Sequence, residues 1–285
     1  MRKRWKWLCL GSAGLALLSA ASLAAVPTLR HITSAVLNDP ARLPTLDHDN
    51  RVHYQPPARA CALKVAALLP AAMEKVADLQ GPWERAPLHV AVFHDEQTYA
   101  RANGTGATWA IGTTFRGRIA LSPRLCAADE ARLRAILTHE LSHAQLEQHV
   151  GGFGMVDLPN WFKEGLAVYV SGGGGAEHTS EDQARAAMNT GTRIALKTHG
   201  SLLNLAAVKF ELPPEWPDTA AKASLAYRQA GMFVAYLHTT NPKNFERMMA
   251  EIRSGKSFSE SFQIAWESPI LTLWAHAFFT PVQPD

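Results

Sequence analysis

The spacing of apolar residues predicts a small β-sheet in the first half of the chain. Residues 61–80 have the three- and four-residue spacing of an amphipathic helix, which a Gly-Pro pair would end. The run LHVAVF predicts a strand over residues 88–93. Two further runs, 107–115 and 117–122, are rich in β-favouring residues and predict two strands of a hairpin or a sheet edge.

The pattern changes to helical spacing beyond residue 129. Asp129 suits the N-cap of a helix whose apolar residues recur every three or four positions, and a Gly-Gly pair at 151–152 would end it. A second helix is expected to begin at about Pro159 and to stop at the glycine run of residues 172–175. Further helices are predicted over residues 178–189, 219–239, 242–254, 257–267 and 269–279.

This order of elements defines the expected fold class. A sheet followed by helices predicts an α+β protein with a small mixed β-sheet lobe and then a mainly α-helical lobe. Residues 26–60 contain prolines among polar residues and show little periodicity, so we interpret them as a linker or lead-in. The folded domain is therefore expected to span residues 61–285.

Residues 1–25 have the pattern of a targeting segment. Four basic residues precede a continuous apolar stretch, and the small residues Ser22 and Ala24 permit cleavage, as in a secretory signal peptide. An apolar run of about 20 residues is also long enough to remain as a single membrane anchor, here over residues 8–26. Both alternatives predict an exported protein, periplasmic or otherwise extracytoplasmic, and the second would anchor it to the inner membrane.

The charge balance gives no sign of a nucleic-acid partner. The formal net charge of +3 belongs to the N-terminal segment, because without its four basic residues 24 Lys and Arg stand against 25 Asp and Glu. A neutral surface has no electrostatic footprint for nucleic acid or for anionic lipid.

Export also changes the interpretation of the cysteines. Cys61 and Cys126 are the two that lie beyond the N-terminal segment. In an oxidising compartment they can form one disulfide, or they can remain as two buried thiols. The sequence supplies no Cα–Cα distance that would decide between these alternatives.

The segment THELSH carries the first candidate chemistry. His139 and His143 are four residues apart in a strongly helical window, so both imidazoles project from one face of the helix. This spacing can hold one Zn²⁺ at about 2.0–2.1 Å from each ring nitrogen. Glu140 lies about 100° round the helix from His139, which suits a general base that touches a metal-activated water.

A catalytic zinc site typically has three protein ligands and one open position. The best third ligand is Glu164 in PNWFKEGLAVY, within the second predicted helix. Two helices joined by a Gly-rich turn can pack antiparallel and direct their ligands to one ion. Ala167, near one turn after Glu164, is small enough to allow that close approach.

HELSH followed by WFKEGLA resembles the gluzincin zinc metallopeptidases, in particular the bacterial peptidase MA-like group with HExxH and a downstream EGLA. The resemblance covers the helix pair well and residues 85–279 more loosely. It implies a zincin-like fold with the HExxH helix at the junction of the two lobes and the substrate in the cleft between them. The zinc ligands that it implies are His139, His143 and Glu164, and the implied general base is Glu140.

The resemblance also suggests how a peptide or protein substrate would bind. In such proteins the edge strand of the sheet often holds peptide in extended form, and residues 117–122 would be that strand. Related enzymes place a Tyr or His of the helical lobe at the oxyanion, which makes Tyr227 a catalytic candidate beside its rivals Arg228 and His199. The alternative, which the sequence alone favours, is that Tyr227 is a helix-packing aromatic.

Two features depart from known zinc-site patterns. Some gluzincins follow the third ligand with a carboxylate that orients a histidine, and this chain has Ala167 there, so the partners of the imidazoles are unassigned. His149 stands at the offset of the third histidine in HExxHxxGxxH, but the required glycine is Leu146 here. On an uninterrupted helix His149 would be about 15 Å along the axis from His139, so we favour Glu164.

Three functions fit these residues. The first is an extracytoplasmic zinc metallopeptidase that acts on peptides or proteins. The second is a zinc hydrolase of another carbonyl substrate, such as a cell-wall amide, and the third is a zinc-stabilised binding or scaffold protein. An intact Glu140 counts against the third, because a scaffold needs no general base.

Overall fold

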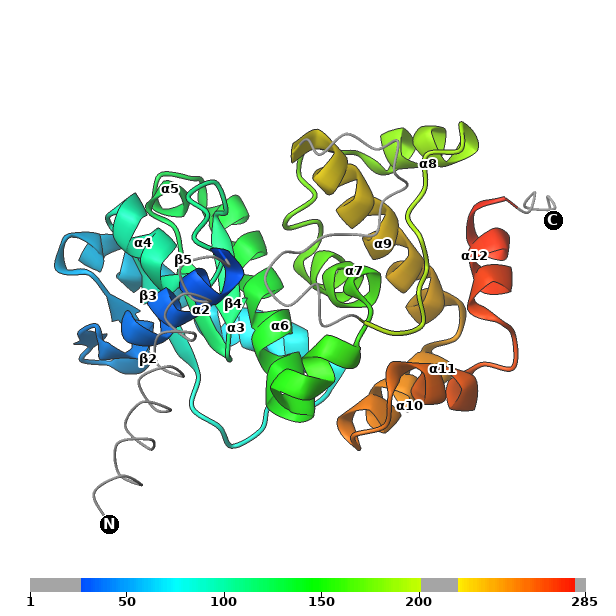
Figure 1. The fold of residues 1–285 in the computed structure, drawn as a ribbon, viewed down its shortest axis with the longest axis horizontal. Helices are drawn as coiled ribbons and strands as arrows, with labels where there is room; N and C mark the ends of the chain where they lie inside the picture. Colours follow the sequence, from blue (N-terminus) through cyan, green and yellow to red (C-terminus); the bar gives the residue numbers. More distant parts are fainter. Residues whose placement is uncertain (1–26, 201–219, 280–285) are drawn as a thin grey trace, which may run out of the picture.

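The computed structural model describes residues 27–200 and 220–279, which form an α+β fold with one mixed sheet (Figure 1). The predicted signal peptide or anchor at the N-terminus lies outside the described residues. Among the described helices, none is long and apolar enough to cross a membrane. The α+β prediction is confirmed at this level.

The sheet has five strands in the order β1-β2-β3-β5-β4. β1 pairs antiparallel with β2, β2 with β3 and β3 with β5 are parallel pairs, and β5 pairs antiparallel with β4. The strands are β1 (Thr45–Leu46), β2 (Asp49–Tyr54), β3 (His89–Val92), β4 (Gly112–Phe115) and β5 (Arg118–Leu121).

Two predictions about this sheet are wrong. Residues 45–54 belong to the sheet, with Leu46 and Val52 buried, so the folded part begins before Cys61. The strand within residues 117–122 is β5, which is internal because β3 pairs with its other side. β4, which pairs with the outer side of β5, is an edge strand of the sheet, and β1 is the strand at the opposite edge.

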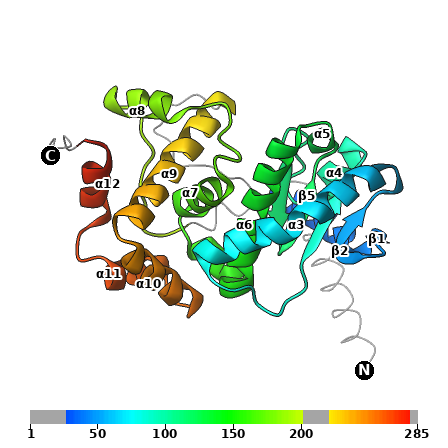
Figure 2. The ribbon, with the colours of Figure 1, turned by 180° about the vertical axis from the view of Figure 1, so that it is seen from behind.

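Helices cover both faces of the sheet. α3 (Arg59–Gln80) and the N-terminal part of α6 cover the face that carries Val90, Val92, Ile119 and Leu121, as seen from behind in Figure 2. α4 (Glu96–Ala102) packs on the opposite face over Ala91 and Ala120, and α2 (Pro27–Leu37) lies beside α4. The remaining short elements of this lobe are η1 (Pro40–Arg42), η2 (Pro56–Ala58) and α5 (Pro123–Cys126).

A disulfide links α3 to α5 in this lobe. Cys61 on α3 is bonded to Cys126 at the end of α5, with their Cα atoms 5.5 Å apart. Of the two alternatives left open by the sequence, the structure has the bridge.

α6 (Glu130–Asp157) lies between the sheet lobe and the helical lobe (Figure 1). Asp129 caps it as predicted, since its side chain accepts a hydrogen bond from the Arg132 amide. The Gly-Gly pair kinks the helix at Gly151, where φ is 66°, and the helix then continues to Asp157. Leu133, Ile136 and Leu137 pack in the core of the sheet lobe. Leu146, further along the same helix, belongs to the core of the helical lobe.

The helical lobe follows the predicted order of helices. α7 (Asn160–Ser171) starts after Pro159 and ends at Gly172, which adopts the left-handed conformation. The other helices are α8 (Glu181–Asn189), α9 (Ala220–Thr240), α10 (Pro242–Arg253), α11 (Phe258–Ala265) and α12 (Ile270–Phe278). Their shared core is rich in aromatic residues, among them Trp161, Phe162, Phe233, Phe258 and Trp274.

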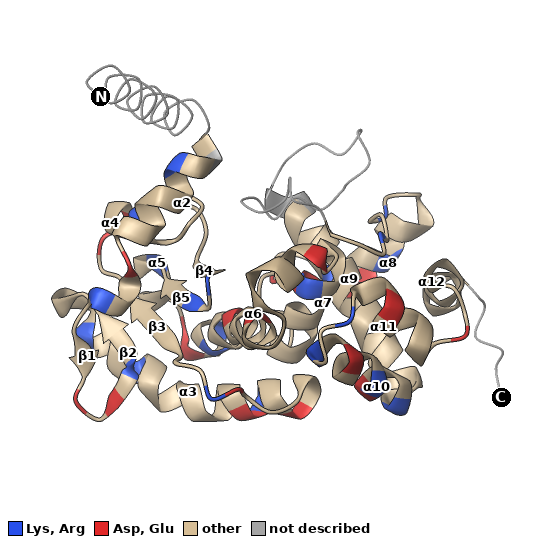
Figure 3. Cartoon of the chain, turned by 60° about the horizontal axis from the view of Figure 1, so that its bottom comes forward, with Lys and Arg blue, Asp and Glu red and all other residues tan. Residues whose placement is uncertain are grey.

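Charged residues of both signs are distributed over both lobes (Figure 3). The absence of a nucleic-acid partner remains a prediction from composition.

Candidate metal site

Three side chains from two helices meet inside the protein. His139 and His143 come from α6, and Glu164 comes from α7. The Nε2 atoms of the two histidines are 3.2 Å apart, and they lie 3.3 and 3.4 Å from Glu164 Oε2. The side chains are almost enclosed, with exposed fractions of 6%, 13% and 6% in the order of the sequence.

The triangle that these atoms form has the size required by a tetrahedral metal ion. Ligands at about 2.0–2.1 Å from a tetrahedral centre are separated from one another by about 3.3–3.4 Å. The observed separations of 3.2–3.4 Å match that value on all three sides. The chemistry also fits, because imidazole nitrogen and carboxylate oxygen are ordinary ligands of Zn²⁺ and other transition metals.

The position of α6 depends on a buried polar cluster on its side facing α3. Ser142 Oγ donates a 2.6 Å hydrogen bond to Gln80 Oε1, and Gln80 Nε2 donates to Gln145 Oε1 at 3.0 Å. Gln145 also donates to the carbonyl of Gly81. Ser142 and Gln145 alternate with the histidines along the helix, so the same stretch of α6 binds α3 and presents the imidazoles.

The charges of the cluster support one another. Burial alone would raise the pKa of Glu164, but the two imidazoles outweigh burial and hold that pKa well below its usual range. Burial would likewise lower the pKa of His139, whereas the hydrogen bond and charge of Glu164 raise it overall. The site therefore stabilises the ionised form of the Glu164 carboxylate beside positively charged groups.

The glycine run after α7 provides the partner of His139 that the sequence left unassigned. His139 Nδ1 donates to the carbonyl of Gly174 at 2.9 Å, which leaves Nε2 free to bind a metal. Gly174 is held in turn by its amide, which donates to Ser171 Oγ at 2.9 Å. The sequence could not identify this partner, because a backbone carbonyl leaves no signal in side-chain identity.

Glu140 lies beside the cluster and does not join it. Its side chain is 6% exposed, and Thr114 Oγ1 on the edge strand lies 2.7 Å from Glu140 Oε2. Gly112, on the same strand, allows this approach, because a Cβ atom there would lie 2.8 Å from Glu140 Oε1. Among the described residues, Glu140 is not part of the group that could hold a metal ion, and its role as a general base stays a prediction.

Tyr227 of α9 also lies at the site. Its ring stacks on that of His139, with centroids 6.2 Å apart and an interplanar angle of 20°. Burial and then the charges of Glu164 and Glu140 raise the pKa of Tyr227 well above its usual value, so the hydroxyl keeps its proton at neutral pH.

Two close helix contacts bring Tyr227 to this position. A Cβ atom on Gly165 of α7 would lie 2.6 Å from the Ala230 carbonyl oxygen of α9, and one on Gly231 would lie 2.5 Å from Val168 Cγ1. The absence of side chains at these two glycines allows α9 to approach the helix that carries Glu164. Sequence spacing alone did not identify this contact.

The rival residues have other partners or positions. Arg228 donates to the carbonyls of Thr179 and Ala176, and so supports the loop after the glycine run. His199 is exposed, and His149 Nδ1 pairs with Glu84 at 3.2 Å. Among the described residues, His149 is not part of the group that could hold a metal ion.

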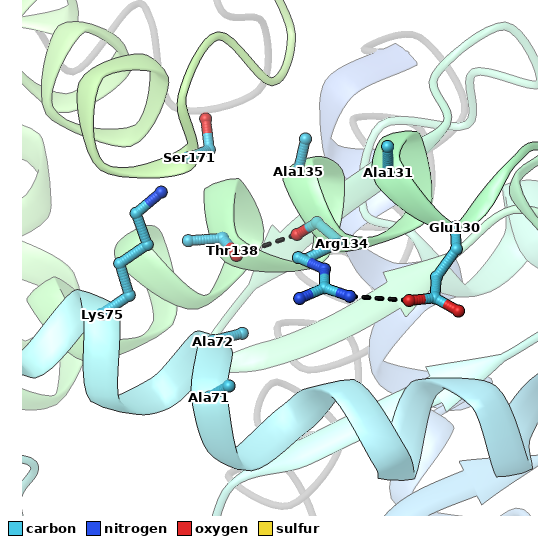
Figure 4. A pocket seen from close by; sticks show the side chains of 9 residues that line it. All are labelled: Ala71, Ala72, Lys75, Glu130, Ala131, Arg134, Ala135, Thr138 and Ser171. Atoms are coloured by element: carbon cyan, nitrogen blue, oxygen red, sulfur yellow. Dashed lines mark hydrogen bonds and ion pairs between the residues drawn. The ribbon is translucent and has the colours of Figure 1, made fainter.

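A separate cavity of about 490 Å³ lies between α3 and α6 (Figure 4). None of the three metal-ligand candidates lines it. Its lining combines four alanines with the polar or charged residues Lys75, Glu130, Arg134, Thr138 and Ser171. Arg134 is paired there with Glu130, and Thr138 Oγ1 donates to the Arg134 carbonyl.

Together, the fold and the site define an α+β protein with a buried cluster of two histidines and one glutamate that could bind a metal ion. No known protein family, curated protein or solved structure matches this chain.

Proposed function

We propose that this protein is an exported zinc-dependent peptidase of the gluzincin type with a zincin-like fold. The observation that carries the proposal is the triangle of His139 Nε2, His143 Nε2 and Glu164 Oε2, whose sides match a tetrahedral Zn²⁺ site. The sequence motifs HELSH and WFKEGLA and the N-terminal targeting pattern support it. Metal binding alone would not require Glu140, which is buried beside the triangle.

Each residue then has a chemical role. Zn²⁺ at this site would supply a Lewis acid that acidifies water and polarises a carbonyl group. Glu140 would take the proton from the attacking water and pass it to the leaving amine. The hydroxyl of Tyr227 would donate a hydrogen bond to the oxyanion as charge develops on it.

A peptide or protein is the substrate class that the surroundings favour. β4 is an edge strand of the sheet, and its residues Gly112 and Thr114 lie directly against Glu140. An edge strand has unpaired backbone groups that can bind an extended peptide as an additional strand. A peptide held along β4 would therefore have its carbonyl groups close to the proposed general base.

The direct test is the zinc content of the purified full-length chain after dialysis, measured by elemental analysis. We expect about one Zn²⁺ per chain, because a catalytic site of three protein ligands binds one ion. His139→Ala and Glu164→Ala should lose it. His149→Ala is the matched control and should keep it, since His149 is paired with Glu84.

The outcomes separate the alternative functions. Failure of the wild type to bind zinc would contradict the proposal at its first step. Zinc binding without hydrolysis of any peptide would favour the scaffold function. Hydrolysis of cell-wall amides but not of peptides would favour the alternative of a zinc hydrolase with a non-protein substrate.

A further inference from the structure

We propose that Thr114 is a positioning residue, which holds the Glu140 carboxylate in the orientation needed for its action as a base. This inference rests on the proposed function of Glu140. Its basis is the contact between edge strand and metal helix, where Thr114 Oγ1 lies 2.7 Å from Glu140 Oε2 and 3.0 Å from the Glu140 backbone carbonyl oxygen.

The hydroxyl of Thr114 has one proton and therefore one main acceptor. The carboxylate oxygen is the closer of the two candidates and carries charge, so it forms the stronger hydrogen bond. This hydrogen bond occupies Oε2 of Glu140, so Oε1 is the oxygen that can accept a proton from water. Thr114 thus selects which carboxylate oxygen is available.

The geometry of β4 makes this contact specific. Thr114 pairs with Ile119 and Gly112 pairs with Leu121, and both partners belong to the face of the sheet that packs on α6. Successive strand residues point to opposite faces, so Thr113 and Phe115 point away from α6. Gly112 completes the arrangement because any Cβ atom there would collide with Oε1 and Cγ of Glu140.

This hydrogen bond connects the open side of β4 with the orientation of the Glu140 carboxylate. β4 has no strand partner on its outer side among the described residues, so a ligand that pairs with β4 would also fix the position of Thr114. The general base would then be ordered by the same strand that binds the peptide. The orientation of Glu140 thereby depends on an element 26 residues away in sequence.

The test compares Thr114→Val, which keeps the shape and removes the hydroxyl, with Thr114→Ser, which keeps the hydroxyl. Thr113→Val is the matched control from the same strand. Hydrolysis of a mixture of internally quenched peptides by the zinc-loaded, full-length chain gives kcat and KM. We expect Thr114→Val to lower kcat roughly 10- to 100-fold at similar KM, with recovery in Thr114→Ser and little change in Thr113→Val.

Zinc content and a crystal structure of Thr114→Val provide readouts that do not depend on activity. We expect unchanged zinc content and a Glu140 carboxylate that has rotated away from residue 114. Wild-type kcat in Thr114→Val, an unmoved carboxylate or a loss of zinc would each overturn the inference. Wild-type protein that binds zinc but hydrolyses nothing would contradict the proposed function instead, and the crystal structure would still test the hydrogen bond.

Discussion

Glu140 and Glu164 are two buried carboxylates near the same imidazoles, with exposed fractions of 6% and 5%. Their surroundings differ. Glu164 lies within 3.4 Å of both histidine Nε2 atoms, whereas Glu140 accepts a hydrogen bond from Thr114 of β4. In the proposed function, Glu164 would bind the metal and Glu140 would move the proton. Substitutions at the two positions should have separable effects.

The substitution Glu140→Gln keeps the size of the side chain and removes its ability to accept a proton. We expect zinc content equal to that of the wild type and peptide hydrolysis lower by several orders of magnitude. Elemental analysis and steady-state kinetics measure the two quantities on one sample. Glu130→Gln is the control, because Glu130 is an exposed residue of the same helix. If Glu140→Gln loses zinc as well, Glu140 is a ligand and the assignment of roles is incorrect.

At the residue scale, helical periodicity was sufficient to place His139 and His143 on one face, whereas Glu164 was proposed from its motif in the second predicted helix. Residues four apart on one helix must share a face, so the first two positions follow from the sequence. Gly174 and Thr114 could not be found in this way. One acts through a backbone carbonyl and the other reaches the site from a strand, and both contacts exist only after the chain has folded.

At the scale of elements, the strand β2 was missed for a physical reason. Three of its six residues are Asp49, Asn50 and Arg51, which resemble loop residues, and prolines lie on both sides. Pairing with β3 buries Val52 and His53 and so stabilises the strand. Local sequence favours a loop here, and tertiary pairing overrides that preference.

The pairing of β2 with β3 includes two histidines and predicts a dependence of stability on pH. His53 Nε2 lies 2.9 Å from His89 Nδ1, and His53 Nδ1 donates to the Leu43 carbonyl. Burial, and then the positive charges of His53 and Arg118, lower the pKa of His89 below its usual 6.5. The unfolded chain therefore binds the proton more readily than the folded chain, so this contribution to stability is present above pH 6.5 and is lost as the pH falls.

Thermal unfolding between pH 7.5 and pH 5 measures this effect. We expect the melting temperature to fall on acidification. It should fall less in His89→Gln, because that variant has no imidazole at position 89 to take up a proton. His178→Gln is the control, since His178 is exposed. An equal fall in His89→Gln and wild type would show that His89 does not contribute.

The contact between α7 and α9 provides a second prediction at this scale. Gly165→Ala would place a Cβ atom 2.6 Å from the Ala230 carbonyl oxygen, so the helices must move apart. Overpacking of this kind costs about 1–3 kcal/mol in the free energy of unfolding. Urea unfolding should show this loss, and activity should fall as well because α9 carries Tyr227. Gly152→Ala is the matched control, since open space surrounds that position, and it should be neutral or slightly stabilising.

At the scale of the whole molecule, the sequence predicted the α+β class and the order of the helices but not the order of the strands. The spacing of apolar residues marks each helix by itself, whereas the strand order depends on the parallel pairs β2–β3 and β3–β5. These pairs join residues far apart in sequence, and no local pattern encodes them. The resemblance to the gluzincins placed residues 117–122 at an edge of the sheet, but β5 lies between β3 and β4, and β4 is at the edge.

The disulfide constrains a large part of the sheet lobe. It joins residues with a sequence separation of 65, and the enclosed loop contains the strands β3, β4 and β5. A crosslink of this length reduces the entropy of the unfolded chain and typically contributes about 2–4 kcal/mol of stability. Because β4 lies against Glu140, loss of the bridge should also make the proposed base less well positioned.

The paired variant Cys61→Ala/Cys126→Ala and a reductant remove the bridge in two independent ways. Both should lower the urea midpoint by similar amounts, and peptide mapping by mass spectrometry should find the Cys61–Cys126 link in the oxidised wild type only. The reductant should have no effect on the midpoint of the double variant, because its bridge is already absent. Equal midpoints for the oxidised and reduced wild type would mean that packing of α3 and α5 alone holds the sheet lobe together.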